Sequence, residues 1–124
     1  MRALRWKAPV IGVALLAAFA ARTAAAADAE HGMDLFQACS ACHSERADAI
    51  GPSLRGVYGR KSAALEDFRY SNPMRRANLV WDEANLRAFI KDPQTTVKGN
   101  RMPYAGQSSD ADVDDLVAYL MTYK

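Results

Sequence analysis

The residues best suited to chemistry form one short run, Cys39-Ser40-Ala41-Cys42-His43. Two cysteines three positions apart in a helical turn point to the same side, so both thiols can add to the two vinyl groups of one porphyrin. The adjacent His43 then presents its imidazole to the iron. This spacing is the attachment signature of a c-type haem, with Cys39 and Cys42 as the covalent anchors.

Two other kinds of site also use closely spaced cysteines. A thiol–disulfide exchange site expects thioredoxin-like βαβ surroundings, and the sequence shows no such pattern. A zinc site needs four ligands, and His31 is the only histidine that could join Cys39, Cys42 and His43. Both alternatives therefore fit the run less well than haem does.

A haem iron held by one histidine needs a second axial ligand or keeps an open position. The candidates are His31, Met33, Met74, Met102 and Met121. Met102 differs from the others because it lies in a loop over 99–106 that begins and ends with glycine and follows no helical periodicity. Such a loop can place the thioether opposite His43. We expect Met121 to pack or lie exposed on the last helix and His31 to lie on the surface.

The elements that must position these groups are helical. We expect helices over 34–41, over 82–90 with Asp82 as the N-cap, and from Ser109 onwards. The last of these carries an apolar stripe at helical spacing, formed by Val113, Leu116, Val117 and Leu120. No segment alternates with a period of two residues. The expected fold is therefore all-α.

The middle of the chain has few periodic apolar positions. Residues 44–80 contain Gly-Pro and Asn-Pro turns and several further glycines, which predicts a long loop with one short helix near 74–77. A loop of this length in a small domain usually encloses something or is functional. Three main helices with such a loop need a bulky apolar guest to complete the core, and one covalent haem would provide it.

Residues 1–27 have the layout of a secretory signal peptide. Basic residues precede an uncharged apolar run over 10–21, and three small residues end at Ala27. The run is short for a membrane span, which needs ~20 apolar residues. We expect cleavage between Ala27 and Asp28, leaving a monohaem domain over 28–124, and an uncleaved N-terminal anchor is the alternative.

Length and charge limit the classes of function. A chain of 124 residues allows one small domain, which excludes a two-domain nucleotide enzyme or a barrel. The net charge of +2 comes without a concentrated basic patch, so nucleic acid is not an expected partner. Residues 1–27 hold four of the 16 basic residues and no acidic one, so 12 basic and 14 acidic residues remain and the net charge becomes −2.

The ordered motifs of residues 30–123 resemble those of the class I c-type cytochromes, in the mitochondrial-like group of soluble bacterial carriers. The motifs that carry the resemblance are Gly32 with Phe36, the haem run, Gly51-Pro52-Ser53-Leu54, residues 56–61, residues 68–71, Trp81, the loop 99–106 and residues 116–120.

This resemblance implies a set of roles around the haem. His43 is the proximal ligand of the iron and Met102 the distal one, and the carbonyl of Pro52 accepts the free ring N–H of His43. The residues that would hydrogen-bond or neutralise a haem propionate are Arg60, Tyr70 and Trp81.

The sequence departs from the pattern of the family at several points. Phe89 stands where many relatives carry a tyrosine near the methionine sulfur, and Met74 occupies the place of a common asparagine. The stretch between His43 and Pro52 is also shorter than in the mitochondrial proteins. The first two changes should alter the reduction potential and the strength of the iron–methionine bond.

A closed His/Met site leaves small substrates no place on the iron, so we expect a one-electron carrier rather than an enzyme. The expected location is the periplasm, and the expected partners are a cytochrome bc-type complex, an oxidase, a reaction centre or a dehydrogenase. The protein should be a monomer without membrane insertion after cleavage. The alternatives are a haem subunit of a larger oxidoreductase and a peroxidase-like or gas-binding haem protein with a weak sixth ligand.

The charged residues predict an asymmetric surface. Lys98 and Arg101 flank the methionine loop, whereas the acidic residues gather on the last helix, at Asp110, Asp112, Asp114 and Asp115. The side at the haem edge should therefore be less negative than the rest, which would steer an electron-transfer partner towards it.

Overall fold

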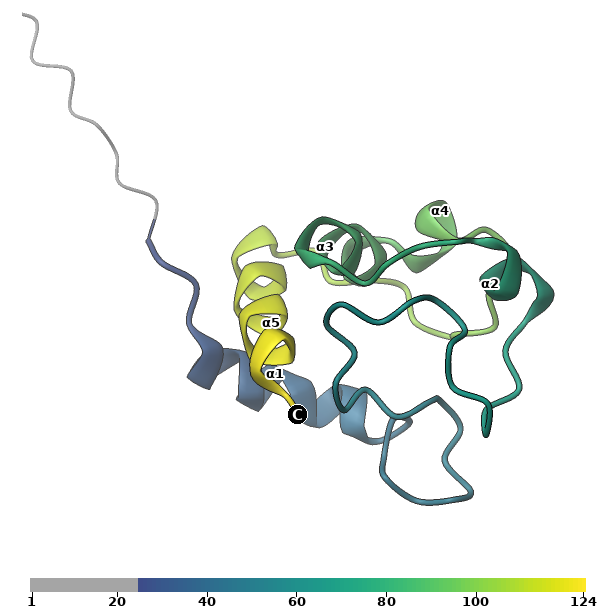
Figure 1. Cartoon of the computed structure of the whole chain (residues 1–124). Helices are drawn as coiled ribbons and strands as arrows, with labels where there is room; N and C mark the ends of the chain where they lie inside the picture. The colour runs from purple at the N-terminus through teal and green to yellow at the C-terminus, as the bar shows by residue number, and fades with distance from the viewer. Residues whose placement is uncertain (1–24) are drawn as a thin grey trace, which may run out of the picture.

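The computed structural model describes residues 25–124, and their regular structure consists of five α-helices (Figure 1). In chain order the helices are α1 (Ala29–Ser40), α2 (Asn72–Arg76), α3 (Glu83–Lys91), α4 (Pro93–Thr96) and α5 (Asp110–Thr122). The β structure in this part of the chain is limited to one antiparallel bridge between Lys61 and Val80. The all-α expectation is confirmed.

All five helices begin at side chains that accept hydrogen bonds from the first turn. Asp28 accepts from the backbone N–H of residues 30 and 31, Asp82 from that of residue 85, and Ser109 from that of residue 112. Such caps satisfy N–H groups that have no partner inside the helix. The predicted starts at Asp82 and Ser109 are therefore correct.

Two expectations about the helices were incomplete. The first helix begins at Ala29 rather than near residue 34, because Asp28 caps an additional turn. Helix α3 ends at Lys91, close to the expected end at residue 90, but Asp92 also caps a further short helix, α4, in which Pro93 occupies the first turn where no N–H is needed. The short helix expected near 74–77 lies at Asn72–Arg76.

Helices α1 and α5 cross closely, as Figure 1 shows on the left of the molecule. Gly32 makes the crossing possible, since a Cβ atom built there would lie 2.0 Å from the carbonyl oxygen of Asp115. One turn later, Phe36 is buried against the stacked rings of Tyr119 and Tyr123, with centroids 5.2 and 5.0 Å away. The sequence pair Gly32 and Phe36 is thus the contact of the first helix with the last.

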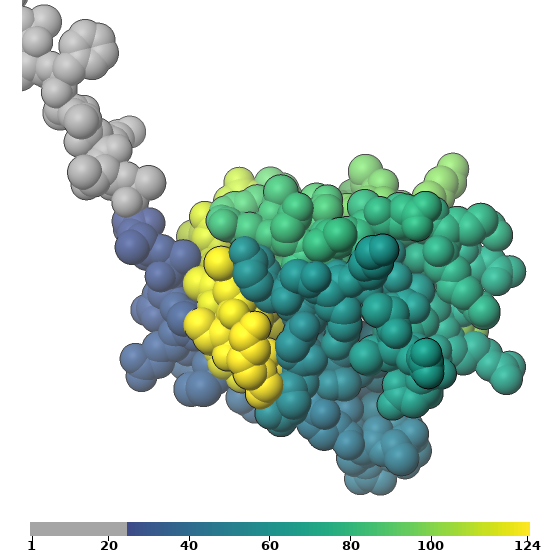
Figure 2. Space-filling model, viewed as in Figure 1, coloured from purple at the N-terminus to yellow at the C-terminus, as the bar shows by residue number. Residues whose placement is uncertain are grey.

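The long loop between α1 and α2 closes against the end of α5. Gly56 N donates to Tyr123 O at 2.7 Å, and the Arg55 guanidinium lies 5.2 Å from the centroid of the Tyr123 ring. Figure 2 shows the side chains of α5 lying directly against those of this loop. The loop is thereby fixed to the helix pair.

Helix α3 is joined to α5 and to the loop that follows α4. Arg87 and Lys91 form ion pairs with Asp114 and Asp110 on α5. Gly106 (φ +106°) passes so close to the end of α3 that a Cβ atom there would lie 2.1 Å from Lys91 O. This glycine fixes one end of the methionine loop.

The leader expected over residues 1–27 falls outside the described residues, except for Ala25, Ala26 and Ala27, which are exposed and non-helical. Across residues 25–124, each helix is too short or too polar to cross a bilayer.

The crossing of α1 and α5 predicts the effect of one added methyl group. Gly32→Ala should lower the free energy of unfolding by about 1–3 kcal/mol, because its Cβ meets backbone rather than a flexible side chain. Gln37→Ala, on the exposed face of α1, is the control and should stay within about 0.5 kcal/mol of wild type. Denaturant titration of the holoprotein measures both, and equal stability of the two variants would contradict the close crossing.

A charged pair also joins α1 to α5. His31 Nδ1 lies 2.8 Å from Asp115 Oδ2, and the other Asp115 oxygen accepts the backbone N–H of Asp28 at 2.7 Å. The hydrogen bond to Asp115 raises the pKa of His31 above 6.5, with Asp112 and Asp28 adding to the effect. The Asp28 N–H and then His31 lower the pKa of Asp115 below 3.8.

These opposite shifts predict a stability maximum in mildly acidic solution. The contribution of His31 to the free energy of unfolding is fully present below pH 6.5 and is lost as the pH rises through its raised pKa. The Asp115 contribution is complete above pH 3.8 and is lost as the pH falls through its lowered pKa. The difference in Tm between wild type and Asp115→Asn should therefore be largest between these values, and the exposed Asp34→Asn on α1, which lies outside this pair, is the control. A Tm difference that is constant from pH 4 to 9 would rule out the pair as the cause.

Candidate functional site

A cavity of about 530 Å³ lies between α1, α3, α5 and the loops. Its volume is within the range of ~300–1,000 Å³ that is typical of ligand pockets. All the residues predicted for the site line this one cavity: Cys39, Cys42, His43, Pro52, Arg60, Tyr70, Trp81 and Met102. They come from segments up to 63 positions apart in the chain, between residues 39 and 102.

The two cysteines lie at and just beyond the end of α1. The chain makes one more turn there, because Cys42 N and His43 N both donate to Cys39 O, at 3.1 and 2.9 Å. Both thiols are free and partly buried, and burial raises the pKa of Cys39. This turn brings both sulfur atoms to the wall of the same cavity.

His43 is buried, with 9% of its surface exposed. Its Nδ1 donates to Pro52 O at 2.7 Å, which leaves the lone pair of the neutral ring on Nε2. Burial lowers the pKa of His43, against the opposing effect of the Pro52 carbonyl. The neutral, oriented imidazole has the form that a metal ligand requires.

Gly51 packs against the face of this imidazole. A Cβ atom on Gly51 would lie 2.7 Å from both Cε1 and Nδ1 of His43, closer than real side-chain contacts allow. Gly51 N also donates to Cys42 O at 2.8 Å, which holds the loop beside the cysteine pair. The Gly-Pro sequence therefore allows the close approach that orients His43.

Met102 is partly buried and lies in the irregular chain after α4, where its N–H donates to Asn100 Oδ1 at 2.9 Å. Met74 also lines the cavity. Met33 is exposed on α1, and Met121 packs against the hydrophobic core. His31 pairs with Asp115 at the crossing of α1 and α5, so it lies on the surface, as expected.

The residues expected near a propionate have contacts of their own. Arg60 donates to Ser53 O and Arg55 O, at 2.7 and 3.1 Å. Tyr70 meets Phe68 edge-on at 4.9 Å, and partial burial raises the pKa of its hydroxyl. Trp81 is buried and meets Phe89 edge-on at 5.1 Å. The role of Arg60, Tyr70 and Trp81 towards a propionate stays a prediction.

Several residues of the cavity wall were not singled out from the sequence. Most are apolar: Val57 lies in the loop after α1, and the helical spacing of Leu86, Ile90, Leu116 and Leu120 had indicated only core packing. Asn100 is different, because it is a buried polar residue in a loop without periodicity. Its position two residues before Met102 was the only feature of the sequence that could have pointed to a role in the site.

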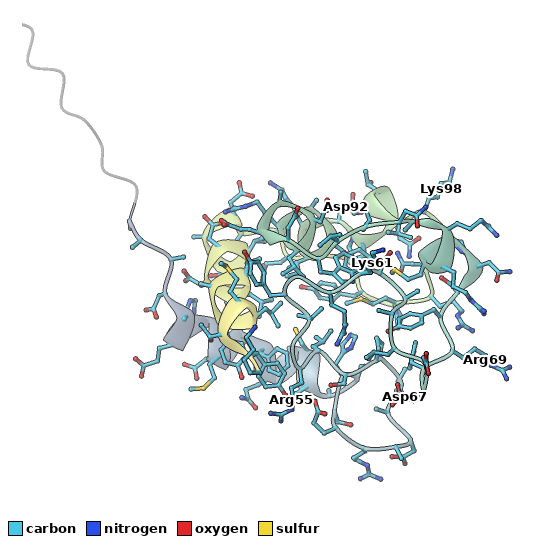
Figure 3. The ribbon with its side chains drawn as sticks, viewed as in Figure 1. Arg55, Lys61, Asp67, Arg69, Asp92 and Lys98 are labelled. Carbon is cyan, nitrogen blue, oxygen red and sulfur yellow. The ribbon has the colours of Figure 1, made fainter. Side chains whose placement is uncertain are left out.

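The acidic residues of α5 are largely paired. Arg87, Lys91 and His31 bind three of the four, which are Asp114, Asp110 and Asp115. Arg69 and Lys98 lie at the end of the molecule away from α5, on the side of α2 and α4 (Figure 3). Arg101 donates to Arg69 O in the same region. The predicted steering of a partner by these cations stays a prediction.

Comparisons with known proteins point to one family. The family model for cytochrome c matches residues 29–124. The chain is 43% identical over 100 residues to cytochrome c2 iso-2 of Magnetospirillum molischianum, covering 79% of this chain and all of that protein. It is 38% identical over 117 residues to cytochrome c2 of Blastochloris viridis, covering 92% and 91% of the two chains. The solved structure of cytochrome cH from Methylobacterium extorquens superposes with a TM-score of 0.73 at 36% identity, covering 77% of this chain and 98% of that one.

The chain belongs to the cytochrome c family, and its fold and motifs place it in class I. Within that class it is a cytochrome c2-like electron carrier and not an enzyme. It carries one covalent haem c, attached through Cys39 and Cys42. The cavity fits this group, because it combines a largely apolar wall with two free thiols and a neutral imidazole whose Nε2 keeps its lone pair.

The contact between Gly51 and His43 predicts a sensitive position. Gly51→Ala should displace the imidazole and lower the free energy of unfolding by about 1–3 kcal/mol. Asp48→Ala, in the exposed part of the same loop, should change it by less than about 0.5 kcal/mol. Denaturant titration and the NMR shift of the His43 ring protons test this. An unchanged His43 environment in Gly51→Ala would show that the glycine does not orient the ring.

Proposed function

We propose that the protein is an exported one-electron carrier whose haem iron is bound by His43 on one side and Met102 on the other. The observation that carries the proposal is the hydrogen bond from His43 Nδ1 to Pro52 O at 2.7 Å, in a cavity that Met102 also lines. That bond leaves the lone pair on Nε2, the atom that would bind the iron, and a methionine on the same cavity would supply a neutral, soft second ligand.

Bound haem supplies a one-electron Fe(II)/Fe(III) couple. His43 and Met102 would both bind the iron and so exclude small molecules from it. The apolar wall, with Leu86 and Leu116 among its members, disfavours the additional charge of the oxidised form. Phe89 presents no hydroxyl to the methionine sulfur, so the thioether would keep its full donor strength, which works in the opposite direction by stabilising the oxidised iron. The methionine ligand and the apolar wall support outer-sphere electron transfer at a relatively high potential.

The polar part of the site would hold the propionates. Arg60, Tyr70 and Trp81 lie together on the wall, and each carries an N–H or O–H donor. A carboxylate taken out of water needs such donors, because its burial is otherwise costly. The Arg60 guanidinium is already oriented by Ser53 O and Arg55 O, which would present its remaining N–H groups in a fixed direction.

The location and the partners follow from the leader and the site. Cleavage between Ala27 and Asp28 would release the domain into the periplasm. There it would exchange electrons with a cytochrome bc-type complex, an oxidase, a reaction centre or a dehydrogenase through a small, transient interface. The mass of the mature protein tests the cleavage. It should equal the mass of residues 28–124 plus one haem, and a mass that retains residues 1–27 would contradict the proposed export.

Replacement of single methionines tests the ligand assignment. Met102→Ala should abolish the methionine–iron absorption band of the oxidised protein, allow imidazole and cyanide to bind, and introduce peroxidase activity. Met74→Leu, on the same cavity, and Met33→Ala, on the surface, are the controls and should keep the band. An unchanged spectrum in Met102→Ala would refute the assignment, and a high-spin spectrum in the wild type would favour the peroxidase-like alternative.

A further inference from the structure

Asn100 is one of the buried polar residues of the described chain, and it lies two positions before Met102 with 7% of its surface exposed. Its Nδ2 donates to Pro93 O and to Val97 O, each at 2.9 Å. Its Oδ1 accepts the N–H of Met102, also at 2.9 Å. One side chain therefore connects the backbone of the methionine to both ends of α4.

The backbone of Asn100 is held as well as its side chain. Gln94 Nε2 donates to Asn100 O at 3.0 Å, and Gln94 Oε1 accepts from Gly99 N at 3.2 Å. Gly99 and Asn100 are therefore both bonded to α4, and Pro93 at the start of that helix is fully buried. Asn100 is thus attached to a fixed part of the molecule.

Apart from Asn100, the chain around Met102 is held further along, where Gly106 packs against Lys91 O and Gln107 N donates to Ile90 O at 3.0 Å. Residues 101–109 form no helix or strand, so ladder hydrogen bonds do not hold them. Gly99 (φ +84°) begins the segment and packs near Pro73, and the Arg101 guanidinium reaches outwards to Arg69 O. At Met102 itself, the hydrogen bond from its N–H to Asn100 Oδ1 is the contact that ties the backbone to the interior of the molecule.

We propose that Asn100 is a positioning residue that holds the Met102 backbone so that its thioether faces the iron. The proposal rests on the ligand assignment of the proposed function and adds to it the group that keeps the ligand in place. A side-chain amide suits this task because it combines two N–H donors with one acceptor. A carboxylate of the same shape would keep the acceptor, lose both donors and face the carbonyls of Pro93 and Val97.

The isosteric change Asn100→Asp tests this in the holoprotein. Loss of the two donors and repulsion by two carbonyl oxygens should free the loop. We expect a weaker methionine–iron band in the oxidised protein and imidazole association about tenfold faster than in the wild type, as for a barrier lowered by one buried hydrogen bond. Stopped-flow mixing with imidazole and the optical spectrum measure these effects.

A control separates positioning from general destabilisation. Val97→Ala removes a buried apolar side chain from the same segment while leaving the Val97 carbonyl in place, so it should lower Tm without changing imidazole association. If Val97→Ala accelerates imidazole as much as Asn100→Asp at a similar loss of Tm, the proposal is wrong. If Asn100→Asp binds imidazole at the wild-type rate while Met102→Ala opens the iron, the proposal fails and the ligand assignment stands. If Met102→Ala leaves the spectrum unchanged, the ligand assignment itself fails.

Discussion

The close crossing of α1 over α5 is the contact on which the rest of the structure depends. Gly32 leaves no space between the helix backbones, and Phe36 fills the next turn among the rings of Tyr119 and Tyr123. The crossing fixes the direction of α1, and its last turn then delivers Cys39 to the cavity. A haem joined to a helix with a different direction would not lie within the apolar wall that α3 and α5 provide.

Irregular chain is held at the cavity by contacts of specific residues rather than by ladders of hydrogen bonds. On the histidine side, Gly51 packs against the imidazole and the Pro52 carbonyl accepts a hydrogen bond from its Nδ1. On the methionine side, Gly106 packs under the end of α3 and Asn100 ties the loop to α4. A covalent cofactor suits such a domain, because a small chain buries too little surface of its own to be very stable.

Much of this could be predicted from the sequence, for identifiable reasons. The spacing of the cysteines and the histidine is typical of covalent haem attachment, and the apolar stripe from Val113 to Leu120 is typical of a helix packed on a core. The starts at Asp82 and Ser109 were also predictable, since capping is a local interaction. The early start of α1 was missed because a glycine at position 32 weakens the helical pattern. Gly32 is needed for a close contact with Asp115, which is distant in the sequence and so leaves no local signal. Asn100 was missed because a polar loop residue gives no sign of burial until the tertiary structure surrounds it.

The central claim is that Met102 is the second ligand of the haem iron. Its most direct test is the NMR spectrum of the reduced holoprotein with isotope-labelled methionine methyl groups. We expect one strongly upfield-shifted methyl resonance, caused by the porphyrin ring current, that disappears in Met102→Ala and persists in Met74→Leu. A spectrum in which the methyl resonance of Met102 stays at an ordinary shift would contradict it.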